Sequence, residues 1–245
     1  MTSLDRMPDS YFMLYGLQRT GTNYLRELME ENFRASEFMN RDDARSLPLH
    51  KHFRLYDEKV FIPDHRYLNN FHFDSFHEFD ACVNGMLGSE MTGRAPLLYL
   101  ITTRDPLSWY PSICRFARKN KWPTCRRRSL NHQYMVDYSL FYKKWLDFSD
   151  QSDRVVIVKY EDLLRELDET LEMIGETFHL ERKHDAVRNV NRVQMSRRFT
   201  EKRRKEILQG QFAGRYTRDE FFILSRNLDP EVTGKLGYQI DNDLR

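Results

Sequence analysis

Two glycines mark the stretch of this sequence that is best suited to hold a phosphate group. Gly16 and Gly21 have the spacing of the glycines in a phosphate-binding loop, with an apolar run before them and a helical pattern after them. Backbone N–H groups at the start of such a helix point toward an anion, and the helix dipole favours its negative charge. The side chains that can contribute to this cradle are Arg19, Thr20, Thr22 and Asn23.

The loop lacks the lysine of the usual nucleoside-triphosphate pattern. That pattern continues after the second glycine with Lys and then Ser or Thr, whose hydroxyl binds magnesium, but this chain has Thr22 and Asn23 there. The sequence therefore favours an anion site that needs no metal, with Arg19 as the source of positive charge. A tight strand-to-helix turn that holds no ligand is the alternative explanation for the two glycines.

A second pair of residues suited to bind phosphate lies near position 100. Arg104 follows the apolar run 97–103, and Ser112 comes eight residues later on an amphipathic segment. A guanidinium offers a fork that matches two phosphate oxygens, and a hydroxyl two helical turns further along can bind a third. Each residue also has a structural explanation when taken singly, Arg104 as the partner of a carboxylate and Ser112 as an ordinary helix serine.

These motifs, together with VKYEDLL at 158–164, resemble the sulfotransferases that use 3′-phosphoadenosine 5′-phosphosulfate (PAPS). In that family a loop of the form (Lys/Arg)-(Ser/Thr)-Gly-Thr grips the 5′-phosphosulfate, and RTGT at 19–22 fits it position by position. The resemblance implies that Arg104 and Ser112 hold the 3′-phosphate and that Tyr160 lies near the nucleotide. It also implies a P-loop-like sulfotransferase fold.

The resemblance covers about residues 11–178 and weakens toward the C-terminus. The family closes an Arg-Lys-Gly stretch over the 3′-phosphate. In this chain Arg197 and Arg198 are the candidates for that contact, but they lack the glycine. A solvated basic helix face explains them equally well.

The resemblance further implies where the chemistry takes place. Sulfuryl transfer builds negative charge on the departing phosphate and requires the acceptor to lose a proton, so it needs positive charge and a base. The family has both in a Lys-Thr-His segment, and LHKHFR at 49–54 offers Lys51 and His52 in adjacent positions. We expect Arg19 and Lys51 to supply the charge and His52 to act as the base.

The spacing of this segment departs from the family pattern. If residues 49–53 form a strand, His50 and His52 lie on one face and Lys51 on the other. Either the strand has ended by Lys51, or the base and the lysine are arranged differently from the family. A histidine pKa of about 6.5 suits proton removal near neutral pH. The other candidates for the base are His50, Glu30 and Glu31.

The elements that must position these residues alternate between strands and helices. Apolar runs at 11–15, 97–103 and 155–160 predict strands, and apolar residues at helical spacing predict a helix after each of them and another at 134–148. This order predicts an α/β fold of three layers, a parallel β-sheet flanked by helices, because each parallel return needs a crossover. The candidate loops then meet at the carboxyl ends of the strands, where such sheets bind ligands.

Length and composition limit the possible classes of protein. With 245 residues and 40% hydrophobic content, the chain suits one domain over residues 1–245. Within it, we interpret residues from about 36 to 96 as an irregular insertion that shapes an acceptor pocket. The 39 basic and 37 acidic residues leave a net charge of +2, too small to attract the whole molecule to nucleic acid or membrane. The three cysteines suit neither a disulfide framework nor a zinc site.

No apolar run approaches the ~20 residues that span a bilayer, and no signal-peptide core begins the sequence. We therefore expect a cytoplasmic protein with no membrane span, no nucleic-acid partner and no metal. The sequence predicts neither the oligomeric state nor the identity of the acceptor.

The resemblance implies transfer of a sulfuryl group from PAPS to a hydroxyl or amine, with release of adenosine 3′,5′-bisphosphate (PAP). The acceptor class that we expect is a carbohydrate, a lipid-linked sugar or another small molecule. One alternative is a P-loop kinase or nucleoside triphosphatase. Another is a non-catalytic protein that binds acidic polymers through the basic clusters at 125–129 and 197–205. A family member that binds the donor without transferring its sulfuryl group also fits.

Overall fold

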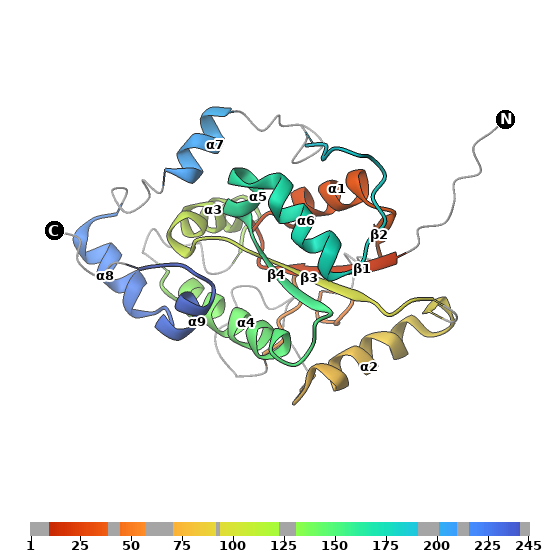
Figure 1. Cartoon of the computed structure of the whole chain (residues 1–245). Helices are drawn as coiled ribbons and strands as arrows, with labels where there is room; N and C mark the ends of the chain where they lie inside the picture. Colours follow the sequence, from red (N-terminus) through yellow and green to blue (C-terminus); the bar gives the residue numbers. More distant parts are fainter. Residues whose placement is uncertain are drawn as a thin grey trace.

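A four-stranded parallel sheet forms the centre of the protein, with strand order β2-β1-β3-β4 (Figure 1). The computed structural model describes residues 10–38, 45–56, 71–91, 94–122, 131–190, 201–209 and 216–240. The strands are β1 (Ser10–Gly16), β2 (Ala35–Glu37), β3 (Leu98–Thr103) and β4 (Val155–Lys159). The predicted α/β class, with a parallel sheet flanked by helices, is confirmed.

Helices cover both faces of the sheet (Figure 1). On one face lie α1 (Thr22–Asn32), α5 (Tyr160–Arg165) and α6 (Leu167–Thr177). On the other lie α2 (Phe76–Leu87), α4 (Gln133–Ser149) and α9 (Pro230–Lys235). The remaining described helices are α3 (Pro106–Lys119), α7 (Glu201–Leu208), α8 (Arg218–Arg226) and the short 3-10 helix Gly88–Met91. Among these described helices, none combines the length and apolar character needed to cross a bilayer.

Strand β1 shows how the sequence builds both faces of the sheet. Phe12 and Leu14 pack into the core on the side of α1 and α5, whereas Met13 and Tyr15 pack into the core on the side of α4. Successive side chains of a strand point to opposite faces. A strand that is buried on both faces therefore has the near-continuous apolar run that the sequence shows at 11–15.

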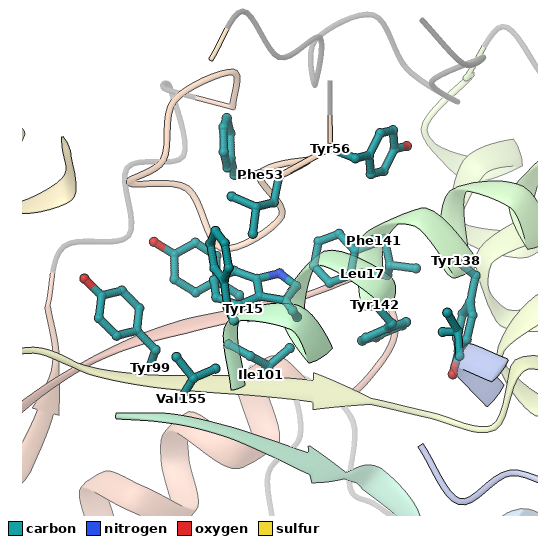
Figure 2. Packing of buried hydrophobic residues seen from close by; sticks show 14 of the residues in the cluster. Tyr15, Leu17, Phe53, Tyr56, Tyr99, Ile101, Tyr138, Phe141, Tyr142 and Val155 are labelled. Atoms are coloured by element: carbon teal, nitrogen blue, oxygen red, sulfur yellow. The ribbon is translucent and has the colours of Figure 1, made fainter. Parts of the chain in front are cut away.

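The core on the side of α4 is largely aromatic and anchors residues 53–56. Figure 2 shows Tyr15, Tyr99 and Ile101 on the strands, with Phe53 and Tyr56 lying further from the sheet beside the side chains of α4. Phe53 is fully buried and Tyr56 is 4% exposed. Burial of both side chains fixes the segment that directly follows His52.

The segment at about 36–96, predicted as an irregular insertion, contains regular elements as well. Strand β2 begins at Ala35 and pairs with the start of β1, and α2 packs one apolar face into the core. That face consists of Phe76, Phe79, Val83 and Leu87. The three- and four-residue spacing of these side chains is helical.

Candidate anion-binding site

The loop between β1 and α1 is tight because its glycines leave no room for a side chain. A Cβ on Gly16 would lie 2.3 Å from Oγ1 of Thr102, and a Cβ on Gly21 would lie 2.4 Å from the ring of Tyr160. Gly21 also has a φ of 103°, which L side chains rarely adopt. The glycines thus have a structural role in the turn. Whether the turn can hold an anion depends on the groups around it.

The amino end of α1 keeps its positive electrostatic character. Gly21, at the cap position, provides no side-chain hydrogen bond, and the first turn of α1 contains no acidic residue. The first turns of α3 and α4 also lack acidic residues, whereas those of α2, α5, α6, α8 and α9 each contain Asp or Glu. Because the N–H groups and dipole of a helix start attract negative charge, this end of α1 favours an anion.

The polar side chains of the loop have different partners. Thr20 is fully buried and its Oγ1 bonds to the backbone oxygen of Leu17 at 2.7 Å and to Oγ1 of Thr102 at 2.8 Å. Thr22 is 5% exposed and begins α1. Asn23, the second residue of the helix, accepts a hydrogen bond from Nζ of Lys51. Thr20 therefore holds the loop together, which is a role that the sequence motif alone does not reveal.

Arg19, which carries the positive charge of this loop, has a strained backbone conformation. Its φ of 77° lies in the left-handed region, which costs a non-glycine residue about 1–3 kcal/mol and occurs most often at functional sites. The side chain is exposed, while the preceding Gln18 is buried and its backbone oxygen accepts from Nε1 of Trp109 at 2.8 Å. The bond to Trp109 fixes the backbone next to Arg19.

The two predicted halves of the site meet in the structure. Nε of Arg19 donates to Oγ of Ser112 at 3.3 Å, and Nη1 of Arg104 lies 3.5 Å from the backbone oxygen of Arg19. Nε of Arg104 donates to Oγ of Ser108 at 2.9 Å, a contact that the sequence prediction missed although Ser108 is four residues further along. The Arg104 guanidinium also lies over the ring of Tyr160, 5.4 Å from its centroid.

Hydrogen bonds at the end of β3 fix the backbone of Arg104. The Tyr138 hydroxyl donates to the backbone oxygen of Arg104 at 2.8 Å, and the Asp105 carboxylate caps α3 by accepting from the N–H of Ser108 at 2.6 Å. The N–H of Asp105 donates to Oε1 of Glu161 at 3.1 Å, which ties β3 to α5. Burial raises the pKa of both carboxyl groups, and the nearby Arg104 guanidinium opposes this shift.

Tyr160 and Tyr24 form an aromatic pair beside Gly21. Tyr160 is the first residue of α5, one position after the end of β4, and is 5% exposed. Its ring packs edge to face with that of Tyr24 at a centroid distance of 6.2 Å. The sequence prediction missed Tyr24, although its position three residues after Gly21 places it in the first turn of α1.

Residues 49–53 form a turn and not a strand. The N–H of Phe53 donates to the backbone oxygen of His50 at 2.8 Å, and the N–H of Gly16 donates to that of Lys51 at 3.0 Å. Nζ of Lys51 donates to Oδ1 of Asn23 at 3.0 Å. The side chain of Lys51 thus reaches the amino end of α1 from a separate segment. The loop before α1 has no lysine of its own.

His52 lies against the end of β1 in a defined tautomer. Its Nδ1 is 2.6 Å from the backbone oxygen of Gly16. Because a carbonyl oxygen only accepts, Nδ1 carries the proton, and in the neutral ring Nε2 keeps its lone pair. Burial lowers the pKa of His52 well below its ordinary value, and the nearby His50, Lys51 and Arg54 lower it further, against the opposing effect of the Gly16 carbonyl. The His52 imidazole is therefore neutral near neutral pH.

The other candidate bases lie in less suitable positions. His50 is 2% exposed, and its Nδ1 accepts from the backbone N–H of His52 at 3.0 Å. Glu30 lies in the last turn of α1, about 12 Å along the helix axis from Thr22. Glu31 pairs with His184 and Arg188, each at 3.7 Å.

Two of the predicted site residues, Arg197 and Arg198, lie outside the described residues.

Within the described ranges, no three side chains of His, Cys, Asp or Glu lie close enough together to hold a metal ion.

Comparisons with known proteins find little similarity. No protein-family model matches the chain, and no curated protein matches it in sequence. Among solved structures, mouse sulfotransferase SULT7A1 complexed with PAP matches with a TM-score of 0.37 and 12% sequence identity, over 88% of this chain and 66% of that one. The chain thus spans about two thirds of the length of that protein. Similarity at this level does not identify a function.

Proposed function

We propose that the protein is a sulfotransferase that moves a sulfuryl group from PAPS to a hydroxyl or amine of an acceptor and releases PAP. The observation that carries the proposal is the meeting of Arg19, Arg104 and Ser112 beside the amino end of α1. This donor has charged groups at both its 5′ and 3′ positions. A loop suited to one anion and an Arg-Ser pair suited to a second, joined by a hydrogen bond, support that assignment.

In the proposed reaction the 5′-phosphosulfate lies at the start of α1. Arg19 and Lys51 stabilise the negative charge that builds on the departing phosphate. The bond between sulfur and the phosphate oxygen breaks while a bond forms between sulfur and the acceptor atom. Nε2 of His52 takes the proton that the acceptor loses and later releases it to solvent. Most of the rate enhancement then comes from positioning and charge stabilisation.

The two alternative functions have weaker support. A P-loop kinase needs Lys and a magnesium-binding hydroxyl where this chain has Thr22 and Asn23. A polyanion-binding protein depends on basic clusters at 125–129 and 197–205, and the acidic Glu201 interrupts the second cluster. The proposal keeps the single domain over residues 1–245 and the cytoplasmic location that the sequence predicts.

An assay of PAP release tests the proposed reaction. The protein is incubated with PAPS and EDTA and with representative carbohydrates, small alcohols and amines, and PAP is quantified by chromatography. We expect PAP to form faster with at least one acceptor class than in buffer alone, and the Arg19→Ala variant to lose this increase. Phosphate transfer from magnesium ATP to the same acceptors in buffer without EDTA, together with no turnover of PAPS, would support the kinase alternative.

A further inference from the structure

A buried ion pair lies next to the candidate base. Nε and Nη2 of Arg54 donate to Oδ1 and Oδ2 of Asp137 in α4, each at 2.8 Å, and both side chains are 1% exposed. The Tyr56 hydroxyl also donates to Oδ1 of Asp137. The Arg54 guanidinium lies 5.7 Å from the centroid of the Phe141 ring. Arg54 is therefore held on several sides within the aromatic core.

Stability alone is a poor explanation for this arrangement. Removing two charges from water costs several kcal/mol for each ion in practice, and apolar side chains of similar volume are often at least as stabilising. A bidentate Arg-carboxylate pair does, however, fix the orientation of the guanidinium. The remaining contacts of Arg54 show what this fixed orientation achieves.

Those contacts join the two functional segments of the site. Nη1 of Arg54 donates to the backbone oxygen of His52 at 2.8 Å, and Nη2 donates to Oε1 of Gln18 at 3.1 Å. Gln18 directly precedes Arg19 in the anion-binding loop. One guanidinium thus binds the segment that carries the base and the loop that carries the charge, while α4 holds it in place through Asp137.

We propose that Arg54, oriented by Asp137, is a positioning residue that sets His52 against the loop of Arg19. This inference rests on the proposed function for its catalytic consequence. Lysine cannot replace Arg54, because an ammonium on a flexible stem does not reproduce the planar fork. Without the fork, the peptide of His52 shifts and the bond from its Nδ1 to the Gly16 oxygen is lost.

A second Arg-Asp fork, with side chains that are 28% and 14% exposed, provides a control outside the candidate site. Nη1 and Nη2 of Arg154 donate to Oδ1 and Oδ2 of Asp80 at 3.1 and 2.7 Å. Arg154 directly precedes β4, so this pair lies at the amino end of the strand, opposite the end that leads to Tyr160. Arg154→Lys therefore damages a bidentate Arg-Asp pair, less buried than that of Arg54, without touching the candidate site.

The test compares Arg54→Lys, Asp137→Asn and Arg154→Lys in the full chain. Thermal denaturation gives the loss of stability, nitrogen-15 NMR of the imidazole rings gives the tautomer of His52, and steady-state kinetics with PAPS give kcat and KM. For Arg54→Lys and Asp137→Asn we expect loss of the single Nδ1-protonated tautomer, a fall in kcat of at least tenfold and a change in KM for PAPS of less than threefold. Arg154→Lys keeps the tautomer and keeps kcat within twofold.

The proposal is overturned if His52 keeps its tautomer in Arg54→Lys and Asp137→Asn, or if kcat falls in the same proportion to the loss of stability in all three variants. Asp137→Asn keeps the side-chain volume and serves if Arg54→Lys does not fold. If the wild-type protein does not turn over PAPS, the proposed function fails, and the NMR comparison decides the positioning role by itself.

Discussion

Nε of Arg19 donates to Oγ of Ser112 at 3.3 Å across 93 residues of sequence. The first residue belongs to the loop after β1, and the second lies on α3, which follows β3. Because β1 and β3 are neighbouring parallel strands, their carboxyl ends meet at one edge of the sheet. A site that binds two anionic groups of one ligand is the simplest explanation for this proximity.

Arg104→Ala should weaken binding of PAP at least tenfold and leave the affinity for ADP within about threefold. Arg104 engages the 3′-phosphate in the proposed site, and a tenfold change corresponds to about 1.4 kcal/mol. Calorimetry on the variant gives both affinities, with circular dichroism as the check that it folds. Similar losses for PAP and ADP would mean that Arg104 has only a structural role.

Gly21→Ala should destabilise the protein and abolish nucleotide binding. The new Cβ would lie 2.4 Å from the Tyr160 ring at a φ of 103°, and such a backbone position costs a non-glycine residue about 1–3 kcal/mol even without the clash. Thermal denaturation measures the effect. The control is Gly234→Ala within α9, where a Cβ meets no atom within 4 Å, so that it should be neutral or stabilising.

His52→Ala should lower the rate of sulfuryl transfer by about a hundredfold or more, because general-base assistance contributes ~10²–10⁴. The affinity for PAP should change little, since Arg19, Arg104 and Ser112 are intact. His50→Ala and Glu30→Ala are measured beside it. A large loss at either position, with His52→Ala near the wild-type rate, would assign the base to another residue.

The pH dependence of the rate should reflect the lowered pKa of His52. Burial favours the neutral ring, so the base stays unprotonated as the pH falls through the ordinary histidine value of 6.5, and the rate declines only at lower pH. The unfolded chain takes up this proton earlier, so the protein also loses stability on acidification below pH 6.5. A rate profile with its acidic midpoint at or above 6.5 would be inconsistent with a base whose pKa is lowered in the folded protein.

The sequence predicts the parts of the site that depend on local patterns. Gly16, Gly21 and Arg19 follow an apolar run and precede a helical one, and Arg104 and Ser112 have the same relation to the next predicted strand. Parallel strands with helical crossovers then bring the two motifs to one edge of the sheet, which the structure shows.

Other parts depend on contacts between distant segments, which no local pattern encodes. Lys51 reaches Asn23 from a turn in which its backbone oxygen accepts from the N–H of Gly16. A strand at 49–53 would have placed the side chains of Lys51 and His52 on opposite faces. Arg54 was missed because a charged residue is expected at the surface unless its partner is known. That partner, Asp137, lies 83 residues away on α4.

Calorimetry with PAP and with ADP, both in EDTA, tests the central claim most directly. In the proposed site Arg104 and Ser112 bind the 3′-phosphate, which PAP has and ADP lacks, whereas the loop at 16–22 binds the 5′-phosphates that both nucleotides carry. We predict that PAP binds at least tenfold more tightly than ADP, a difference of about 1.4 kcal/mol or more. Equal affinities for the two nucleotides, or tighter binding of ADP once magnesium is added, would contradict the assignment of a PAPS site.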